Sequence, residues 1–123
     1  MHKRLTGIAQ AIFDKKGFNI LILDVRDICS MTDYFIIAEG TVDRHLRAIS
    51  SDIVDHLAEH GWKPLHIEGE REGDWIVIDF LDVVVHLFTP ELREKYALEK
   101  LWKAGKVVDV DLVVTKPIVS SRP

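Results

Sequence analysis

The segment GDWIVIDFLDVVVHLF, spanning Gly73–Phe88, decides the fold of this chain of 123 residues. It holds two apolar runs, Trp75–Phe80 and Val83–Phe88, with only Leu81 and Asp82 between them. Short runs rich in valine and isoleucine, joined by two residues, are typical of a β-hairpin. We therefore expect two adjacent antiparallel strands here, with a tight turn at positions 81 and 82.

The two faces of this hairpin differ in composition. Because side chains alternate along a strand, one face carries only apolar residues, which are Ile76, Ile78, Phe80, Val83, Val85 and Leu87. This face is predicted to pack against helices. The opposite face carries three cross-strand pairs, which are Trp75 with Phe88, Val77 with His86, and Asp79 with Val84. Large aromatic side chains mixed with a few polar ones are typical of a protein-binding patch. The alternative is that another segment covers this face and that His86 is a hydrogen-bonded core histidine.

The chain before the hairpin alternates helical and strand patterns. Apolar residues at helical spacing predict a first helix that ends near Gly17, and they are Leu5, Ile8, Ala9, Ile12 and Phe13. Residues 19–25 (NILILDV) and 33–40 (DYFIIAEG) are predicted to be strands buried on both faces. Thr41 is predicted to cap a second helix that ends near Gly61, with Asp43 in its first turn. Residues 64–69 (PLHIEG) form a short predicted strand.

The chain after the hairpin is predicted to contain one more helix and a tail. Thr89 and Pro90 suit the start of a third helix, which continues through Trp102. Residues 106–123 alternate weakly and end in polar residues and prolines, which indicates an extended arm with a disordered end. We therefore place a single domain at residues 1–105 and a tail at residues 106–123.

These elements predict an α/β fold, a single domain with one mixed sheet of about five strands and about three helices. A strand, a helix and a further strand in that order imply a right-handed parallel crossover. Five strands about 4.8 Å apart make a sheet roughly 24 Å wide, and three helices about 10 Å apart cover one such face. If the three helices share a side, part of the other face is left bare.

Composition and charge exclude several classes of protein. The formal net charge is -4 at pH 7, whereas proteins that hold nucleic acid by neutralising phosphates usually carry a basic balance. No apolar run approaches the roughly 18 residues of a membrane-spanning helix, and the first residues lack the layout of a signal peptide. The single cysteine, Cys29, is interpreted as a small buried thiol in a reducing compartment. We expect a cytoplasmic protein with no membrane contact and no primary nucleic-acid binding.

Motifs that would build an active site are weak or missing. His56, Glu59 and His60 match the H-x-x-E-H spacing of inverted zinc proteases, but the sequence offers no third ligand. Asp79 and Asp82 are three apart across a strand end and a turn, so their carboxylates are not expected to share a face. No glycine-rich phosphate-binding motif and no nucleophile elbow occurs in the sequence. We therefore expect no enzyme activity, no metal and no cofactor.

Three segments together resemble the ribosomal silencing factor family, also called RsfS or Iojap. They are residues 30–41 (SMTDYFIIAEGT) followed by Arg44 and His45, residues 73–88, and residues 93–102 (REKYALEKLW). The resemblance spans most of the chain, from about Leu5 to Trp102, and leaves the tail out. It implies a mixed α/β sheet similar to that of nucleotidyltransferases, in a protein without catalytic activity.

The resemblance also implies a partner and a mechanism. Members of the family bind the large ribosomal subunit through large-subunit ribosomal protein fourteen. Occupying that surface sterically blocks association with the small subunit and represses translation. Homodimers are common in the family, so a homodimer is a further expectation.

The expected contact face is the aromatic side of the hairpin, because an acidic domain with such a patch can dock on a basic ribosomal protein. The partner-binding residues are predicted to be Trp75, Val77, Asp79, Val84, His86 and Phe88, with Tyr96 and Glu99 at the margin. One position departs from the family, which usually has glycine where this chain has Leu81. A tight turn that needs positive φ tolerates leucine poorly, so either the turn type differs or the turn is strained.

Two alternatives remain open. A nucleotidyltransferase on the same fold would hold a triphosphate at the Gly40-Thr41 turn. It needs paired carboxylates for magnesium, and no Asp-x-Asp or Asp-x-Glu follows Gly40 in a strand. A self-association module would bury the aromatic side of the hairpin against a second copy. In that case Trp75 and Phe88 would lie in the dimer interface and be unavailable to a ribosome.

Overall fold

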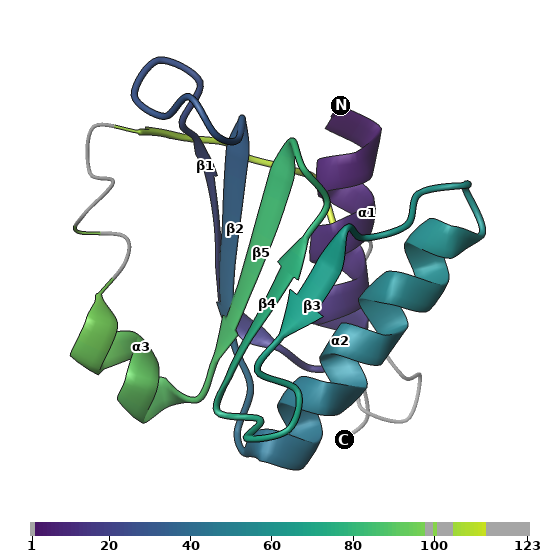
Figure 1. Ribbon diagram of the computed structural model, residues 1–123, viewed down its shortest axis with the longest axis vertical. Helices are drawn as coiled ribbons and strands as arrows, with labels where there is room; N and C mark the ends of the chain where they lie inside the picture. The colour runs from purple at the N-terminus through teal and green to yellow at the C-terminus, as the bar shows by residue number, and fades with distance from the viewer. Residues whose placement is uncertain (1, 98–99, 101–104, 113–123) are drawn as a thin grey trace, which may run out of the picture.

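The computed structural model describes residues 2–97, 100 and 105–112. In chain order the elements are α1 (His2–Asp14), β1 (Phe18–Asp24), β2 (Tyr34–Glu39), α2 (Asp43–Ala58), β3 (His66–Glu68), β4 (Trp75–Asp79), β5 (Val83–Phe88), α3 (Pro90–Tyr96) and β6 (Lys106–Val107). The strands form one six-stranded mixed sheet in the order β3-β4-β5-β2-β1-β6 (Figure 1). The predicted single α/β domain is confirmed. The sheet exceeds the expected size because β6 comes from the predicted tail.

One parallel contact lies at the centre of the sheet. β2 and β5 run parallel, whereas the other neighbouring strands pair antiparallel. The strand that follows α2, β3, runs in the same direction as β2, as a parallel crossover requires, but it lies at the edge of the sheet. β4 and β5 fill the two positions between them. The hairpin therefore occupies the interior of the sheet.

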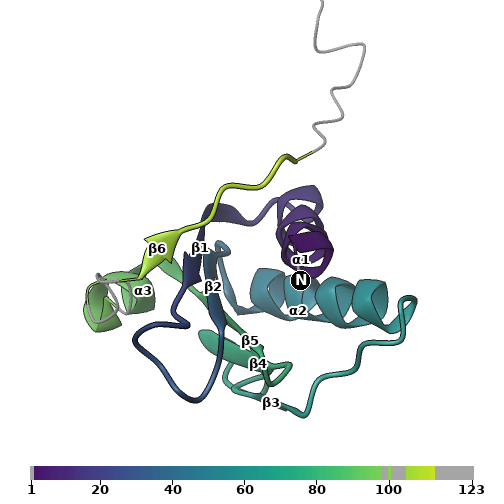
Figure 2. The ribbon, with the colours of Figure 1, turned by 90° about the horizontal axis from the view of Figure 1, so that it is seen from above.

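The hairpin has the predicted register and buries the predicted face. Trp75 pairs with Phe88, Val77 with His86, and Asp79 with Val84. The apolar face is closed, with 0% exposure for Ile76, Ile78, Val83, Val85 and Leu87 and 6% for Phe80. These side chains share one core with α1 and α2, which lie side by side on this face of the sheet (Figure 2). Burial of six such side chains contributes roughly 10–15 kcal/mol before chain entropy is subtracted.

The start of α2 differs from the prediction. Val42, not Thr41, is the N-terminal cap, and no side chain in the described part of the chain caps the helix there. Thr41 instead donates its backbone N–H to Nδ1 of His45 (2.9 Å), and Nε2 of the same ring donates to the Lys15 carbonyl (2.7 Å). His45 thereby ties the turn before α2 to the end of α1. Asp43 occupies the first turn of the helix, as predicted.

The third helix is shorter than predicted and lies on the other side of the sheet. α3 ends at Tyr96, because Ala97 adopts a left-handed conformation with φ of 47° that cannot continue a right-handed helix. The predicted continuous helix through Trp102 is therefore wrong at Ala97, and residues 98–99 and 101–104 lie outside the described residues. α3 packs against β5 from the face opposite to α1 and α2 (Figure 2), so the three helices do not share a side.

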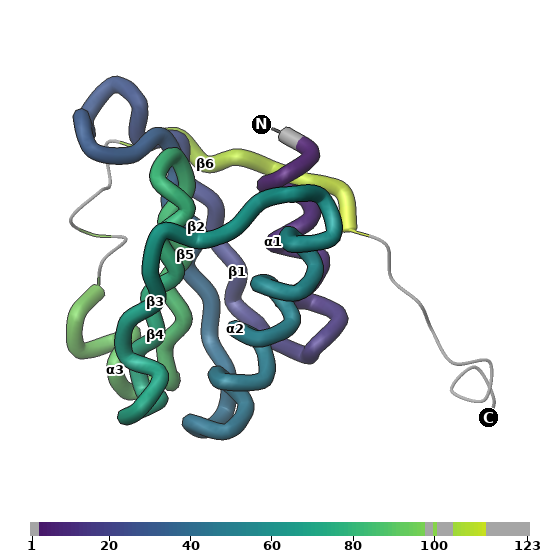
Figure 3. The backbone as a smooth tube through the Cα atoms, turned by 45° about the vertical axis from the view of Figure 1, so that its right-hand side comes forward, coloured from purple at the N-terminus to yellow at the C-terminus, as the bar shows by residue number. Residues whose placement is uncertain are grey.

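The first part of the segment after residue 105 belongs to the sheet. β6 pairs with Leu23 and Asp24 of β1. Beyond β6 the chain passes toward α1 (Figure 3), where three partly buried side chains pack against the main core, namely Val108, Val110 and Leu112. Residues 113–123, which include the predicted disordered end, lie outside the described residues.

The hairpin turn is strained at Leu81. This residue has φ of 81°, a region that residues with a Cβ rarely adopt. The N–H of Asp82 donates to the Phe80 carbonyl (3.1 Å), so Leu81 is the central residue of a three-residue γ-turn. The Leu81 N–H donates to Oδ1 of Asp79 (2.8 Å), and the leucine side chain is 63% exposed. The strain expected for leucine at this position is therefore present.

Candidate functional site

The side of β4 and β5 that points away from α1 and α2 is only partly covered. Five of its side chains are half-buried, and we call this group the outer face: Trp75, Val77, Asp79, Val84 and His86. Phe88 is the exception, because it is fully buried at 0% exposure. The expectation that Phe88 contributes accessible surface is therefore wrong.

Phe88 belongs to a second, smaller core on this side of the sheet. The buried members are Leu23, Val25, Ile37 and Phe88, and the partly buried Leu21, Cys29, Phe35, Trp75 and Leu92 pack around them. Leu92 comes from α3, so this short helix covers the end of β5. Cys29 is a half-buried free thiol, less enclosed than predicted. The alternative in which another segment covers the aromatic side is thus correct for Phe88, whereas the outer face keeps partial access to solvent.

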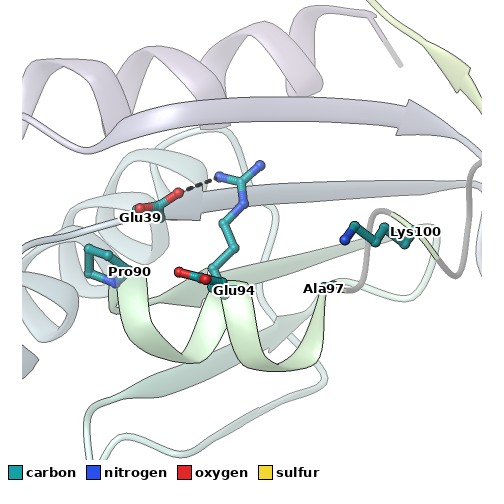
Figure 4. A pocket seen from close by; sticks show the side chains of 6 residues that line it. Glu39, Pro90, Glu94, Ala97 and Lys100 are labelled. Carbon is teal, nitrogen blue, oxygen red and sulfur yellow. Dashed lines mark hydrogen bonds and ion pairs between the residues drawn. The ribbon is translucent and has the colours of Figure 1, made fainter.

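A nearly buried ion pair fastens α3 to the sheet (Figure 4). Arg93 of α3 donates to Oε2 of Glu39 (3.1 Å) at the end of β2, and Glu39 is 7% exposed. Asn19 donates its side-chain amide to the same carboxylate oxygen (3.0 Å), and Arg93 also donates to the Asn19 carbonyl. Because a buried charge without its partner is costly, this network holds α3 in place. The position of α3 in turn decides which aromatic rings lie beside the outer face.

Trp75 packs against two aromatic rings. Its indole stacks on Phe88, with ring centroids 5.0 Å apart and 27° between the planes. Tyr96 of α3 also lies against the indole, with centroids 4.8 Å apart and 39° between the planes. Tyr96 is 44% exposed, so it adds an accessible ring next to the outer face. Glu99, the other residue predicted at the margin, lies outside the described residues.

His86 lies on β5, within the outer face, and is hydrogen-bonded to Trp75. The indole Nε1–H donates to Nδ1 of His86 (3.2 Å). Phe35 of β2 meets the imidazole edge-on, with centroids 5.4 Å apart. Burial lowers the pKa of His86 from 6.5 to about 4, because the charged ring would lose its hydration. The ring is therefore neutral near pH 7, and the outer face contains a pre-arranged aromatic row that runs from Phe35 to Tyr96.

Acidic side chains border the outer face toward the edge of the sheet. The β3–β4 register places His66 opposite Asp79 and Glu68 opposite Val77, so both β3 side chains share this side of the sheet. His66 lies 3.4 Å from Glu68 and 3.9 Å from Asp79, measured between side-chain nitrogen and oxygen atoms. This margin carries two carboxylates beside a neutral aromatic surface, which favours a basic partner.

The weak catalytic motifs do not come together as a site. The guanidinium of Arg4 engages Asp82 through two hydrogen bonds of 2.6 and 2.8 Å, which ties α1 to the hairpin turn. In the H-x-x-E-H motif, Nδ1 of His60 donates to the His56 carbonyl (3.1 Å), and the His60 ring stacks on Trp62. Among the described residues, no group of three or more histidine, cysteine, aspartate or glutamate side chains is placed to hold a metal ion.

The Gly40-Thr41 turn is closely packed. A side chain at Gly40 would meet Leu46 at 2.8 Å and His45 at 3.1 Å, so packing alone accounts for the glycine. Thr41 lines two pockets. One is lined in part by three carboxylates, those of Asp43, Asp74 and Glu91, and the other is lined by Asp14, Lys15, Lys16 and His45 as well. The negative charge of the first pocket disfavours a triphosphate there.

Sequence patterns identify the hairpin residues but miss their neighbours. Phe35 lies in a strand that is apolar at nearly every position, so alternation assigns no face to it. Its pairing with Val84 across the β2–β5 contact is what places it next to the outer face. His66 and Glu68 are missed for a related reason, because the position of β3 beside β4 depends on pairing that the local pattern does not specify.

Comparison with known proteins assigns the chain to a family. The family model described as "Ribosomal silencing factor during starvation" matches residues 1–122. The chain is 40% identical over 103 residues to Ribosomal silencing factor RsfS of Bacillus subtilis (strain 168), a match that covers 84% of this chain and 87% of that protein. Over 90 residues it is 42% identical to a Mus musculus protein named Mitochondrial assembly of ribosomal large subunit protein 1, covering 64% of this chain and 40% of the mouse protein.

A solved structure agrees with the family match. The crystal structure of a Chromobacterium violaceum protein superimposes on this chain with a TM-score of 0.80 and 29% sequence identity, covering 97% of both chains. In the part of the chain that the structure describes, no helix is both long and apolar enough to cross a membrane. From its sequence match over nearly the full length and from its fold, the chain belongs to the ribosomal silencing factor family.

Proposed function

We propose that this chain is a translation repressor without catalytic activity that binds the large ribosomal subunit through large-subunit ribosomal protein fourteen. Membership of the ribosomal silencing factor family supports the proposal, and so does the mouse relative, whose name refers to assembly of the large subunit. The observation that carries the proposal is the outer face. It is a pre-arranged aromatic surface that remains half-open on a hairpin whose other face is closed to solvent.

The contact is proposed to form through the outer face, with Tyr96 at its margin. Trp75 is the anchor, because buried tryptophans carry a large share of the binding energy in protein interfaces. Phe88, Tyr96 and His86 hold the indole before the partner arrives, so little side-chain entropy is lost on binding. Glu68 and Asp79 would face basic side chains of the ribosomal protein.

The proposed mechanism is steric and needs no chemistry at the outer face. A folded domain bound where the two subunits meet occupies space that the small subunit requires. Translation is then repressed, because subunits that are held apart cannot form a joined ribosome. The proposal places the protein in the cytoplasm, together with the ribosomes that it binds.

Sedimentation of ribosomal subunits tests the proposal. Purified large and small subunits are mixed with an excess of the protein under ionic conditions that favour joining, and the mixture is resolved on a sucrose gradient. We expect the protein to sediment with free large subunits and the fraction of joined ribosomes to fall. Undiminished joining, with the protein left at the top of the gradient, contradicts the proposal.

Trp75→Ala should weaken binding to the large subunit by about 2 kcal/mol or more, because it removes the proposed anchor. Since Trp75 also packs on Phe88, a urea titration of each variant checks that it is folded. The matched control is Asp55→Ala, a change at an exposed position on α2 that should leave binding unchanged. A folded Trp75→Ala variant with wild-type affinity would remove Trp75 from the contact.

A homodimer through the outer face is the competing proposal, because half-open aromatic rings also suit a second copy of the chain. The two proposals differ at Trp75, which cannot lie in a dimer interface and in a ribosome contact at once. Analytical ultracentrifugation separates them. A dimer that dissociates on Trp75→Ala, while subunit binding is unaffected, supports self-association and opposes the ribosome contact.

A further inference from the structure

We infer that His86 recognises a neutral hydrogen-bond acceptor, a backbone carbonyl oxygen of the bound protein, through its Nε2–H. The inference rests on the proposed function, since it concerns the same outer face. It adds one directional polar contact to a surface that otherwise binds through apolar and aromatic side chains. His86 would then help to determine specificity as well as support the indole of Trp75.

Trp75 fixes which nitrogen of His86 carries the proton. An indole N–H is a donor only, so the nitrogen that it contacts must accept. Nε1 of Trp75 lies 3.2 Å from Nδ1 of His86, which makes Nδ1 the acceptor. In a neutral imidazole with an accepting Nδ1, the proton is on Nε2. Burial keeps the ring neutral, because it lowers the pKa of His86 to about 4.

Two aromatic neighbours hold the orientation of the imidazole. Phe35 contacts it edge-on at a centroid distance of 5.4 Å. Phe88 lies nearly parallel to it, with centroids 6.1 Å apart and 11° between the planes. Rotation of the ring would break the bond to Trp75 and disturb both contacts. The direction of the Nε2–H is therefore set before a partner binds.

The described residues supply no internal acceptor for the Nε2–H of His86. Among the described residues, Trp75 is the one hydrogen-bond partner of the His86 ring. The buried side-chain polar atoms that lack a partner in the same residues are Arg4 Nε, Thr32 Oγ1 and Ser50 Oγ. Nε2 of His86 is not among these atoms and the residue is only half-buried, so water can accept a hydrogen bond from the Nε2–H. A partner that covers the outer face must replace this water with an acceptor of its own.

The surroundings of His86 favour a neutral acceptor over an anion. Val77 lies directly across from His86, so the contact is framed by apolar surface. Asp79 lies diagonally across the same pair of strands, paired with Val84, and its carboxylate repels a second negative charge. A carboxylate of the partner would also lose its hydration with a single donor to replace it. A backbone carbonyl has no net charge and accepts one hydrogen bond readily.

Two amide variants separate the roles of the two ring nitrogens. His86→Asn places an amide near the position of Nδ1, where it can accept from Trp75, but it does not reach the position of Nε2. His86→Gln reaches that position with an N–H donor. We expect His86→Asn to raise the Kd for free large subunits roughly tenfold to a hundredfold, because the partner's acceptor is left unpaired, and His86→Gln to raise it much less.

The two variants also define what overturns the inference. A Kd for His86→Asn equal to that of the wild type would show that no acceptor meets Nε2. Equal losses in both variants would show that the ring acts by shape and not as a donor. Absence of binding by the wild-type chain is a different result, because it contradicts the proposed function itself.

Nitrogen-15 NMR of the wild-type chain gives a test that does not depend on how the variants fold. Long-range proton–nitrogen spectra should show His86 as the Nε2-protonated tautomer in the free protein. Addition of isolated large-subunit ribosomal protein fourteen should slow the exchange of the Nε2 proton with water. A ring protonated on Nδ1, or an Nε2 proton that exchanges equally fast in the complex, overturns the inference.

Discussion

The two faces of one hairpin differ in what surrounds them, although the same two strands supply both. The apolar face shares one buried core with α1 and α2 and is closed to solvent. The outer face meets the short helix α3 at one end, where Phe88 is sealed, and it stays half-open elsewhere. Strand composition alone does not make this difference, since Phe88 is as apolar as any residue of the closed face. The placement of the helices makes it.

The two faces of the hairpin serve different purposes, since one stabilises the fold and the other is proposed to bind a partner. Side chains on the closed face have given up their contact with water and contribute their burial energy to folding. Side chains on the outer face still touch water in part. The energy of burying this remaining apolar surface is therefore available for binding a partner. Changes to the closed face should therefore alter the free energy of unfolding, whereas changes to the outer face should alter affinity.

The largest expected effect comes from releasing α3, the helix that covers one end of the outer face. Arg93→Ala leaves the carboxylate of Glu39 nearly buried without its guanidinium and should lower the free energy of unfolding by about 3 kcal/mol or more. Trp75 fluorescence should shift to longer wavelength as Tyr96 moves away from it. Adding Glu39→Gln to Arg93→Ala removes the unpaired charge and should restore part of the loss. A single variant as stable as the wild type would show that α3 is held by apolar contacts alone.

The titration of His86 reports how far the outer face is shielded from water. Its pKa is about 4 in the folded chain against 6.5 in a model peptide. Between these values the unfolded chain binds a proton that the folded chain does not, so stability should fall as the pH falls through this window. At about 1.4 kcal/mol per pKa unit, the total loss is about 3 kcal/mol.

Urea titrations of the wild type and of His86→Gln across this pH window measure that effect. The difference between the two profiles isolates the imidazole. The lowered pKa of Asp24, about 2 because of its hydrogen bonds with Arg26, matters below the usual aspartate value of 3.8, outside the window. Profiles that run parallel between pH 6.5 and 4 would show that water reaches the ring freely.

Adjacent valines on β5 test the two faces with identical chemistry. Val85→Ala removes two methyl groups from the closed face and should lower the free energy of unfolding by about 2 kcal/mol. Val84→Ala removes the same groups from the outer face and should cost less than about 1 kcal/mol. Denaturant unfolding of both variants measures the difference. Equal costs would mean that the outer face is as enclosed as the other.

The smallest expected effect is at the turn that joins the two strands. Leu81→Gly should raise the free energy of unfolding by about 0.5–1 kcal/mol, because glycine adopts φ of 81° without steric cost, although it gains more freedom in the unfolded chain. Leu81→Ala is the matched control, since it shortens the exposed side chain but keeps the Cβ. Calorimetry should show a higher Tm for the glycine variant alone. A stabilised alanine variant would show that the exposed leucine side chain, and not the positive φ angle, destabilises the turn.

The hairpin could be predicted residue by residue, whereas the coverage of its outer side could not. Alternation and a two-residue turn specify which side chains share a face, and the observed register agrees at every pair. The burial of Phe88 depends on α3, whose side of the sheet and whose end at Ala97 leave no local mark in the sequence. Thr41 is a comparable case. A threonine before a helix is an ordinary cap, but the His45 side chain bonds its backbone N–H and leaves Val42 as the cap.

By itself the sequence determined the two strands of the hairpin, their pairing with each other and the division of the hairpin into an apolar and an aromatic side. These properties follow from contacts between near neighbours, two residues apart along a strand or across one turn. The tertiary structure alone decided which aromatic side chains remain accessible. That outcome depends on a charged pair 54 positions apart, Glu39 and Arg93, which holds a short helix over one end of the sheet. It also depends on strand neighbours such as Phe35 that only long-range pairing brings to the site.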